Sequence, residues 1–184
     1  MTGTSEMMRP FAEKVLPEGW NLLVPQAEFS HTSRGYTWWR YEGGVNPGRR
    51  ILTAKELSDV DTSLLKIVNQ LPDDELVLGG FSQGGTMACK LALEHPDVVD
   101  GFIVHNAKLP NVYQIRTDKS EYKRLRGLVI NGKYDKILNP INSKQIANTF
   151  IALGSKIQSK ELEIGHEFPK LSRDMINEWM DLSN

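Results

Sequence analysis

The chain has 184 residues, a length that suits a single domain, residues 1–184, built around one core. With 40% hydrophobic residues, 24% charged residues and a net charge of −1, it has the composition of a globular protein and no electrostatic basis for binding nucleic acid or a membrane surface. Its single cysteine, Cys89, lies in an apolar helical stretch as a small core residue and excludes an internal disulfide or a multi-cysteine metal site.

Short apolar runs alternate with segments of helical periodicity along the chain. In chain order the pattern predicts a strand at 20–24, a helix at 54–70, a strand at 75–78, a helix at 83–94, strands at 101–104 and 127–130, a helix at 142–153, a weaker strand at 159–164 and a helix at 171–182. Continuous apolar strands separated by helices indicate an α/β fold, a mostly parallel sheet with helices on both faces. Ligands of such sheets bind at the carboxyl ends of the strands.

The stretch from 26 to 50 is the least regular part of the chain and is rich in aromatic residues and glycine. A long loop in a compact domain is often functional, so one interpretation is that Trp38 or Trp39 lines a substrate pocket. The other interpretation is a surface loop that the two tryptophans anchor to the core. The sequence does not decide between them.

The strongest local motif is a GFSQG pentapeptide at residues 80–84, which fits the GxSxG pattern around Ser82. In α/β-hydrolases this pattern forms a sharp strand-to-helix turn that exposes a nucleophilic serine. The pentapeptide alone is weak evidence, since a serine in an ordinary turn or helix cap would also fit. Here a predicted strand precedes it and a predicted helix follows it, which favours Ser82 as a nucleophile.

A serine hydroxyl needs a neighbouring base to take its proton. The chain has four histidines, His31, His95, His105 and His166. In α/β-hydrolases the order along the chain is serine, acid, histidine, with the histidine after the last strand. Only His166 fits that order, although a histidine in that loop would otherwise be an ordinary surface residue.

The acid should lie between the serine and the histidine, at the end of a strand. Asp135 follows the strand at 127–130 after a short turn, and the role we predict for it is to accept the N–H of His166 and fix its tautomer. The alternative is a turn-forming aspartate, which is a common use of this residue. Asp97, Asp100 and Asp118 are less well placed.

Taken together, these segments resemble the phospholipase/carboxylesterase family of α/β-hydrolases, which have no large lid domain. The matching segments are GWNLLVPQAE at 19–28, the aromatic pair at 38–39, LGGFSQGG at 78–85, the Leu-Pro pair at 109–110, NGKYDKILNP at 131–140 and IGHEFP at 164–169. The resemblance implies an oxyanion donor in the backbone N–H of Gln83 and substrate contacts for Trp38, Trp39 and Leu109.

The chain departs from this family at two places. The family normally begins with a strand that ends in a His-Gly-x-Gly motif and supplies the second oxyanion donor, and here Met1 falls at the donor position. We therefore expect the sequence to be an N-terminally shortened version of a longer chain. In addition, Asn106 and Ala107 stand where the family has Ser-Gly, and we expect this change to affect the pocket wall and not the triad.

The predicted function is hydrolysis of carboxylic esters or thioesters through an acyl-serine intermediate, with a small-molecule substrate and without metal or cofactor. A lysophospholipase or an acyl-protein thioesterase would differ only in the acyl donor. A non-catalytic binding protein that keeps the fold belongs to another class. No apolar run approaches the ~20 residues of a membrane span, so we expect no stable membrane insertion and a cytoplasmic location. A homodimer is left open.

Overall fold

The computed structural model describes residues 3–31, 35–42, 51–168 and 173–181. The chain divides into two compact units, one of residues 38–168 and the other of the terminal segments 1–37 and 169–184. The expectation of a single domain stays a prediction. No helix in the described part of the chain is long and apolar enough to cross a bilayer, and the cytoplasmic location also stays a prediction.

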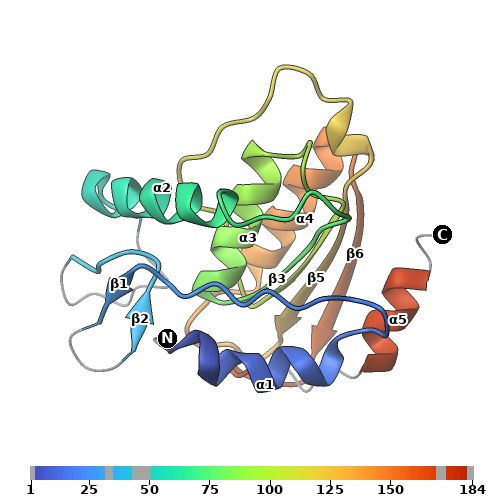
Figure 1. The fold of residues 1–184 in the computed structure, drawn as a ribbon, viewed down its shortest axis with the longest axis horizontal. Coiled ribbons are helices and arrows are strands. Elements are labelled where there is room, and N and C mark those ends of the chain that lie inside the picture. Colours follow the sequence, from blue (N-terminus) through green and yellow to red (C-terminus); the bar gives the residue numbers. More distant parts are fainter. Residues whose placement is uncertain (1–2, 32–34, 43–50, 169–172, 182–184) are drawn as a thin grey trace. The chain divides into compact units, whose positions relative to one another are not determined.

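The larger unit contains a four-stranded sheet in the order β3-β4-β5-β6 (Figure 1). All three strand pairs are parallel, so the carboxyl ends of the strands lie at one edge. The strands are β3 (Val77–Phe81), β4 (Gly101–His105), β5 (Arg126–Gly132) and β6 (Lys156–Leu162). The predicted parallel α/β sheet is confirmed, with strand ends that differ from the predicted ones by a few residues.

Helices connect these strands in the order that the periodicity predicts. In Figure 1, α2 (Ala54–Val68), α3 (Gln83–Glu94) and α4 (Ile141–Leu153) lie on one side of the sheet. Helix α3 packs on β3 and β4, α4 packs on β5 and β6, and α2 packs on α3. The bounds of α3 match the predicted helix at both ends.

Local signals explain where two of these helices begin and end. Helix α2 starts at a capping box, in which the Thr53 side chain accepts the Glu56 N–H and the Glu56 side chain accepts the Thr53 N–H. Helix α4 ends at Gly154, which adopts a left-handed conformation with φ of 103°.

Large apolar side chains fill the space between sheet and helices. Phe102 of β4 and Phe150 of α4 are fully buried, and their ring centroids lie 4.4 Å apart. Tyr122, in the short 3-10 helix η1 (Glu121–Lys123), is also buried and donates its hydroxyl to the Leu93 carbonyl. Cys89 is buried in α3, as expected of a small core residue.

The smaller unit consists of α1 (Ser5–Val15), the antiparallel pair β1 (Phe29–Ser30) and β2 (Tyr36–Thr37), and α5 (Arg173–Asp181). Helix α1 packs on α5, and the Ser5 N–H donates to the Gln26 side chain over 3.0 Å. Helix α1 is not among the elements that the apolar pattern predicts. It contains Pro10, a residue that normally ends a helix.

The predicted strand at 20–24 is wrong. These residues form no regular secondary structure and pair with no described strand. An apolar run becomes a strand only where a neighbouring strand accepts its backbone hydrogen bonds, and the run itself carries no information about such a neighbour. The described parts of the irregular stretch at 26–50 contain only the short strands β1 and β2.

Candidate active site

Ser82 lies at the junction between β3 and α3, where the chain turns sharply. Its backbone adopts φ 53° and ψ −115°, a conformation that non-glycine residues rarely adopt and that marks a strained turn. The Ser82 N–H donates to the His105 carbonyl over 3.0 Å, and the Ser82 carbonyl accepts the Thr86 N–H over 3.1 Å. These bonds attach the turn to the end of β4 and to the first turn of α3.

The glycines around Ser82 differ in how much space they have. A Cβ on Gly80 would lie 2.5 Å from the backbone of Gly84 and 2.6 Å from the Cα of Gly85, so no side chain fits there. A Cβ on Gly85 would lie 2.6 Å from the Cβ of Ala107. Around Gly84 the nearest atom outside its own helix is 4.0 Å away. The steric need for glycine therefore falls on Gly80 and Gly85, although the pentapeptide motif ends at Gly84.

This difference leads to a prediction for two neighbouring glycines of β3. Gly80→Ala should lower the free energy of unfolding by roughly 1–3 kcal/mol or more, because the new methyl group meets backbone atoms that cannot move aside. Gly79→Ala, the matched control, has no atom within 4 Å of the added Cβ and should change stability by no more than about 0.5 kcal/mol. Urea unfolding of both variants measures the difference. Equal midpoints for the two would contradict the description of the turn.

The structure brings the side chains of Ser82, Asp135 and His166 together. His166 Nε2 lies 3.0 Å from Ser82 Oγ, and His166 Nδ1 lies 2.7 Å from Asp135 Oδ2. The three residues follow β3, β5 and β6, and all sit at the carboxyl edge of the sheet. The Asp135 side chain is 2% exposed and that of His166 is 11% exposed, so water competes little for the hydrogen bond between them.

Asp135 is oriented by its own turn. Its Oδ1 atom accepts the backbone N–H groups of Ile137 and Leu138, each over 2.8 Å. The turn-forming role of the aspartate is therefore compatible with the predicted triad role, because each uses a different oxygen. Two fixed donors on Oδ1 leave Oδ2 aimed at His166.

The Phe81 ring packs against the imidazole of His166 and against two further rings. The Phe81 ring lies 5.1 Å from the His166 ring and 5.5 Å from the rings of His105 and Phe168, between centroids. His105 is 2% exposed, and neither of its ring nitrogens has a hydrogen-bond partner among the described residues. Burial, together with the nearby His166, lowers the pKa of His105 to about 4. At neutral pH the His105 side chain is therefore uncharged.

Gln83 links the serine turn to the aromatic segment that precedes α2. Its backbone occupies the first position of α3, where N–H groups point out of the helix and have no carbonyl within the helix to bond. Its side chain accepts the Trp38 N–H over 3.3 Å and donates to the Tyr41 hydroxyl over 2.7 Å. The residue after Ser82 thus holds the Trp38–Tyr41 segment beside the turn.

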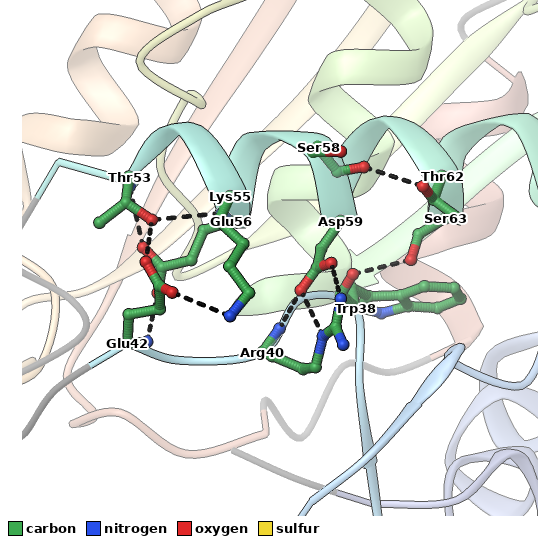
Figure 2. Close-up of polar contacts among 10 residues, drawn as sticks. All are labelled: Trp38, Arg40, Glu42, Thr53, Lys55, Glu56, Ser58, Asp59, Thr62 and Ser63. Atoms are coloured by element: carbon green, nitrogen blue, oxygen red, sulfur yellow. Dashed lines mark hydrogen bonds and ion pairs between the residues drawn. The ribbon is translucent and has the colours of Figure 1, made fainter.

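Helix α2 fixes the other side of this segment, as Figure 2 shows. Ser63 donates its hydroxyl to the Trp38 carbonyl over 2.7 Å. Asp59 accepts the backbone N–H and the guanidinium of Arg40, and these hydrogen bonds hold the pKa of the Asp59 carboxyl below its ordinary value. Further contacts in Figure 2 join Glu42, Thr53, Lys55 and Glu56.

The predicted substrate and oxyanion residues lie in different surroundings. Trp39 is 2% exposed and belongs to the core, where its ring packs edge-on against Tyr41. Trp38 and Leu109 are partly buried and pack against that core. Met1 lies outside the described residues. The placement favours the anchoring interpretation for Trp39 and leaves the pocket interpretation for Trp38.

Asn106 lies near the predicted triad and makes contacts that the sequence did not reveal. Its side chain is buried and bonds the backbones of Gly132 and Gly165, close to Asp135 and His166. We expected a change of pocket wall at this position, but the side chain reaches the loops that contain Asp135 and His166. The residue type gives one usable signal, since asparagine adopts the positive φ found here several-fold more readily than most non-glycine residues.

The donors that a resident metal would need are not assembled in the part of the chain that the structure describes. No group of three or more histidine, cysteine, aspartate or glutamate side chains is placed to hold an ion there. The expectation that the reaction needs no metal or cofactor stays a prediction.

Comparison with known proteins gives one family and several structural neighbours. A family model described as the alpha/beta hydrolase fold matches residues 2–126. No curated protein matches the chain by sequence. A carboxylesterase from Mesorhizobium loti is similar in structure, with a TM-score of 0.76, 16% identity, and coverage of 97% of this chain and 83% of that chain.

Two further solved structures show the same likeness. A Bacillus cereus carboxylesterase has a TM-score of 0.65 and 15% identity, and the match covers 99% of this chain and 84% of that chain. Arabidopsis thaliana SOBER1 has a TM-score of 0.67 and 15% identity, over 98% of this chain and 93% of that chain. At these identities the likeness concerns the fold alone.

Proposed function

Because the chain belongs to the α/β-hydrolase fold family, we propose that it is a serine hydrolase that cleaves carboxylic esters or thioesters through an acyl-serine intermediate. One observation carries the proposal. On a strained turn at the carboxyl edge of the sheet, Ser82 Oγ lies 3.0 Å from His166 Nε2, and His166 Nδ1 lies 2.7 Å from Asp135. A serine, a base and an orienting carboxylate in this arrangement form the triad of acyl-transfer enzymes.

The proposed reaction has two halves. In the first, Ser82 Oγ attacks the acyl carbonyl while His166 Nε2 takes the hydroxyl proton. The tetrahedral intermediate collapses, the bond to the alcohol or thiol breaks, and His166 gives the proton to that leaving group. In the second half His166 takes a proton from a water molecule as the water oxygen attacks the acyl-serine. This second tetrahedral intermediate collapses, its bond to Ser82 Oγ breaks, His166 returns the proton to Ser82 Oγ, and the carboxylic acid departs. Asp135 keeps the Nδ1–H of His166 in place and stabilises the imidazolium.

The negative charge on the substrate oxygen needs fixed donors. We assign one of them to the backbone N–H of Gln83, the residue after the nucleophile, at the N-terminal end of α3. A single oxyanion donor is worth about 2.7–4 kcal/mol of transition-state stabilisation. The second donor, which the family resemblance assigns to Met1, lies outside the described residues.

Trp38 and Leu109 are the residues that we propose for contact with the acyl or alcohol group. Trp38 lies beside the start of α3, since its Nε1 atom is 4.0 Å from a Cβ placed on Gly84. Its backbone is held on both sides, because its N–H donates to the Gln83 side chain and its carbonyl accepts the Ser63 hydroxyl. A ring that is only partly buried and firmly attached next to the nucleophile is suited to packing against an apolar chain.

The two tryptophans should respond differently to substitution. Trp38→Ala should change the ratio of kcat/KM between short and long acyl esters more than it changes Tm, because its ring is partly exposed beside α3. Trp39→Ala should cost about 3–5 kcal/mol of stability, because its ring is buried in the core. Thermal unfolding and a series of p-nitrophenyl esters measure both effects. If Trp38→Ala only lowers Tm, both tryptophans are core anchors.

The direct test of the proposed function is hydrolysis of a matched ester and thioester that carry the same short acyl group. We expect turnover of at least one of them, unchanged in the presence of a chelator, since the proposed chemistry uses only side chains of the chain itself. A preference for long-chain lysophospholipid or for acylated peptide would identify the narrower alternatives. No turnover of any acyl donor would favour a non-catalytic binding protein with the same fold.

A further inference from the structure

We propose that Asn106 is a positioning residue, whose side-chain amide holds the loop of Asp135 and the loop of His166 at the spacing that the triad requires. The inference rests on the proposed function, because it assigns a role within that site. It is carried by hydrogen bonds in the structure and by the backbone conformation of Asn106 itself.

The Asn106 amide uses both of its ends. Its Oδ1 atom accepts the N–H of Gly132 over 2.7 Å, and its Nδ2 atom donates to the carbonyl of Gly165 over 3.0 Å. Gly132 ends β5 and opens the turn that leads to Asp135. Gly165 is the residue before His166. One buried side chain, 2% exposed, thus bonds the backbone just ahead of the acid and just ahead of the base.

The backbone beside Asn106 also bonds the turn that contains Ser82, the third member of the proposed triad. Asn106 directly follows β4, and its own N–H donates to the Ile130 carbonyl over 3.0 Å. Its neighbour His105 accepts the Ser82 N–H over 3.0 Å. The end of β4 therefore contacts the segments that carry Ser82, Asp135 and His166.

The position also selects the residue type. Asn106 has φ of 43°, in the left-handed region that asparagine adopts more readily than most residues. An amide offers a donor and an acceptor at once, whereas aspartate at neutral pH offers acceptors only. Among side chains of this size that tolerate the backbone, asparagine is the one that can bond an N–H and a carbonyl on two different loops.

Backbone contacts between the two loops do not replace this bridge. The Lys133 N–H donates to the Leu162 carbonyl and the Tyr134 N–H donates to the Ile164 carbonyl. These two bonds pair the loops at positions other than Gly132 and Gly165. At Gly132 the two loops approach so closely that a Cβ would lie 2.5 Å from the Gly165 carbonyl oxygen. The backbones of Gly132 and Gly165 form no hydrogen bond with each other, and the Asn106 amide supplies the link.

Two substitutions test the inference. Asn106→Gly keeps the positive φ and removes both side-chain bonds, whereas Asn106→Asp keeps the shape and the bond to Gly132 but sets a carboxylate oxygen against the Gly165 carbonyl. We expect each to lower kcat for a short-chain ester by on the order of 10- to 100-fold, with little change in KM, since misplacing catalytic groups by an ångström costs about that much.

Asn111→Gly is the matched control. Asn111 also makes two side-chain hydrogen bonds to backbone atoms, both of them on Leu52. Leu52 is not part of the loops that contain Asp135 and His166. This variant should keep the wild-type kcat. A second readout is the proton NMR signal of the His166 Nδ1–H, which a strong hydrogen bond to a carboxylate moves far downfield. We expect that signal in the wild type and its loss or upfield movement in the Asn106 variants.

The outcomes separate the two proposals. A folded Asn106→Gly or Asn106→Asp variant with wild-type kcat would overturn the positioning role. If Asn106→Gly fails to fold, the Asn106→Asp variant decides, because it keeps the shape of the side chain. If the wild type hydrolyses no ester or thioester, the proposed function fails, and the His166 signal still decides the positioning role. An unchanged signal in both variants would overturn it.

Discussion

Replacing Ser82 by alanine should lower kcat for a short-chain p-nitrophenyl ester by on the order of 10⁶-fold. The substitution removes the oxygen that attacks the acyl group and leaves His166 without a proton to take. The fold should remain, because the one lost hydrogen bond contributes only about 0.5–1.5 kcal/mol. The Cβ atom and the backbone of the turn stay as they are, with the Ser82 N–H bonded to His105.

The measurement compares initial rates and thermal unfolding for Ser82→Ala and for Ser58→Ala. Ser58 is an exposed residue of α2, and its backbone carbonyl accepts the Thr62 hydroxyl. The control should therefore keep full activity. A Ser82→Ala protein that turns over ester at the wild-type rate would remove Ser82 from the mechanism.

Asp135→Asn should lower kcat by on the order of 10⁴-fold while keeping the fold. Two backbone N–H groups, from Ile137 and Leu138, point at one oxygen of the carboxylate. In the variant they will select the amide orientation that offers them its oxygen. The amide nitrogen then faces His166 Nδ1 and donates to it. This tautomer carries its proton on Nε2, so the imidazole cannot take the proton of Ser82.

A matched control exists elsewhere in the same unit. Asp118 also accepts a backbone N–H, from Ser120, but contacts no triad residue. Asp118→Asn should keep both the turn and the activity. Steady-state kinetics on the two variants provide the comparison. If Asp135→Asn retains more than a small fraction of wild-type kcat, the tautomer argument is wrong and the aspartate only shapes its turn.

The parts of the fold that could be predicted are those with local signals. The helix after Ser82 was predicted with the bounds that α3 has, because an apolar strand, a glycine-rich turn and a helical pattern follow one another directly. The three side chains of the proposed triad were selected by their order along the chain, and the structure places them within hydrogen-bond distance. A short motif and the order of residues along the chain can be read without knowing the fold, so the sequence alone reveals them.

The parts that could not be predicted depend on partners distant in the sequence. The segment 20–24 has the composition of a strand but pairs with no strand among the residues that the structure describes. The role of the Gln83 side chain depends on Trp38 and Tyr41, more than 40 positions earlier in the chain. Asn106 bonds residues that are 26 and 59 positions away. Contacts of this kind leave no periodicity and no motif, and only the folded chain reveals them.

The most direct test of the proposed mechanism is covalent labelling of the wild-type protein with a fluorophosphonate, followed by mass spectrometry of the digested chain. Only an activated serine oxygen displaces fluoride from phosphorus at a useful rate. We predict one adduct per chain, on the peptide that contains Ser82, and its absence when Asp135→Asn protein is treated for the same time. No adduct on the wild type, or an adduct on another serine such as Ser159, would contradict the account.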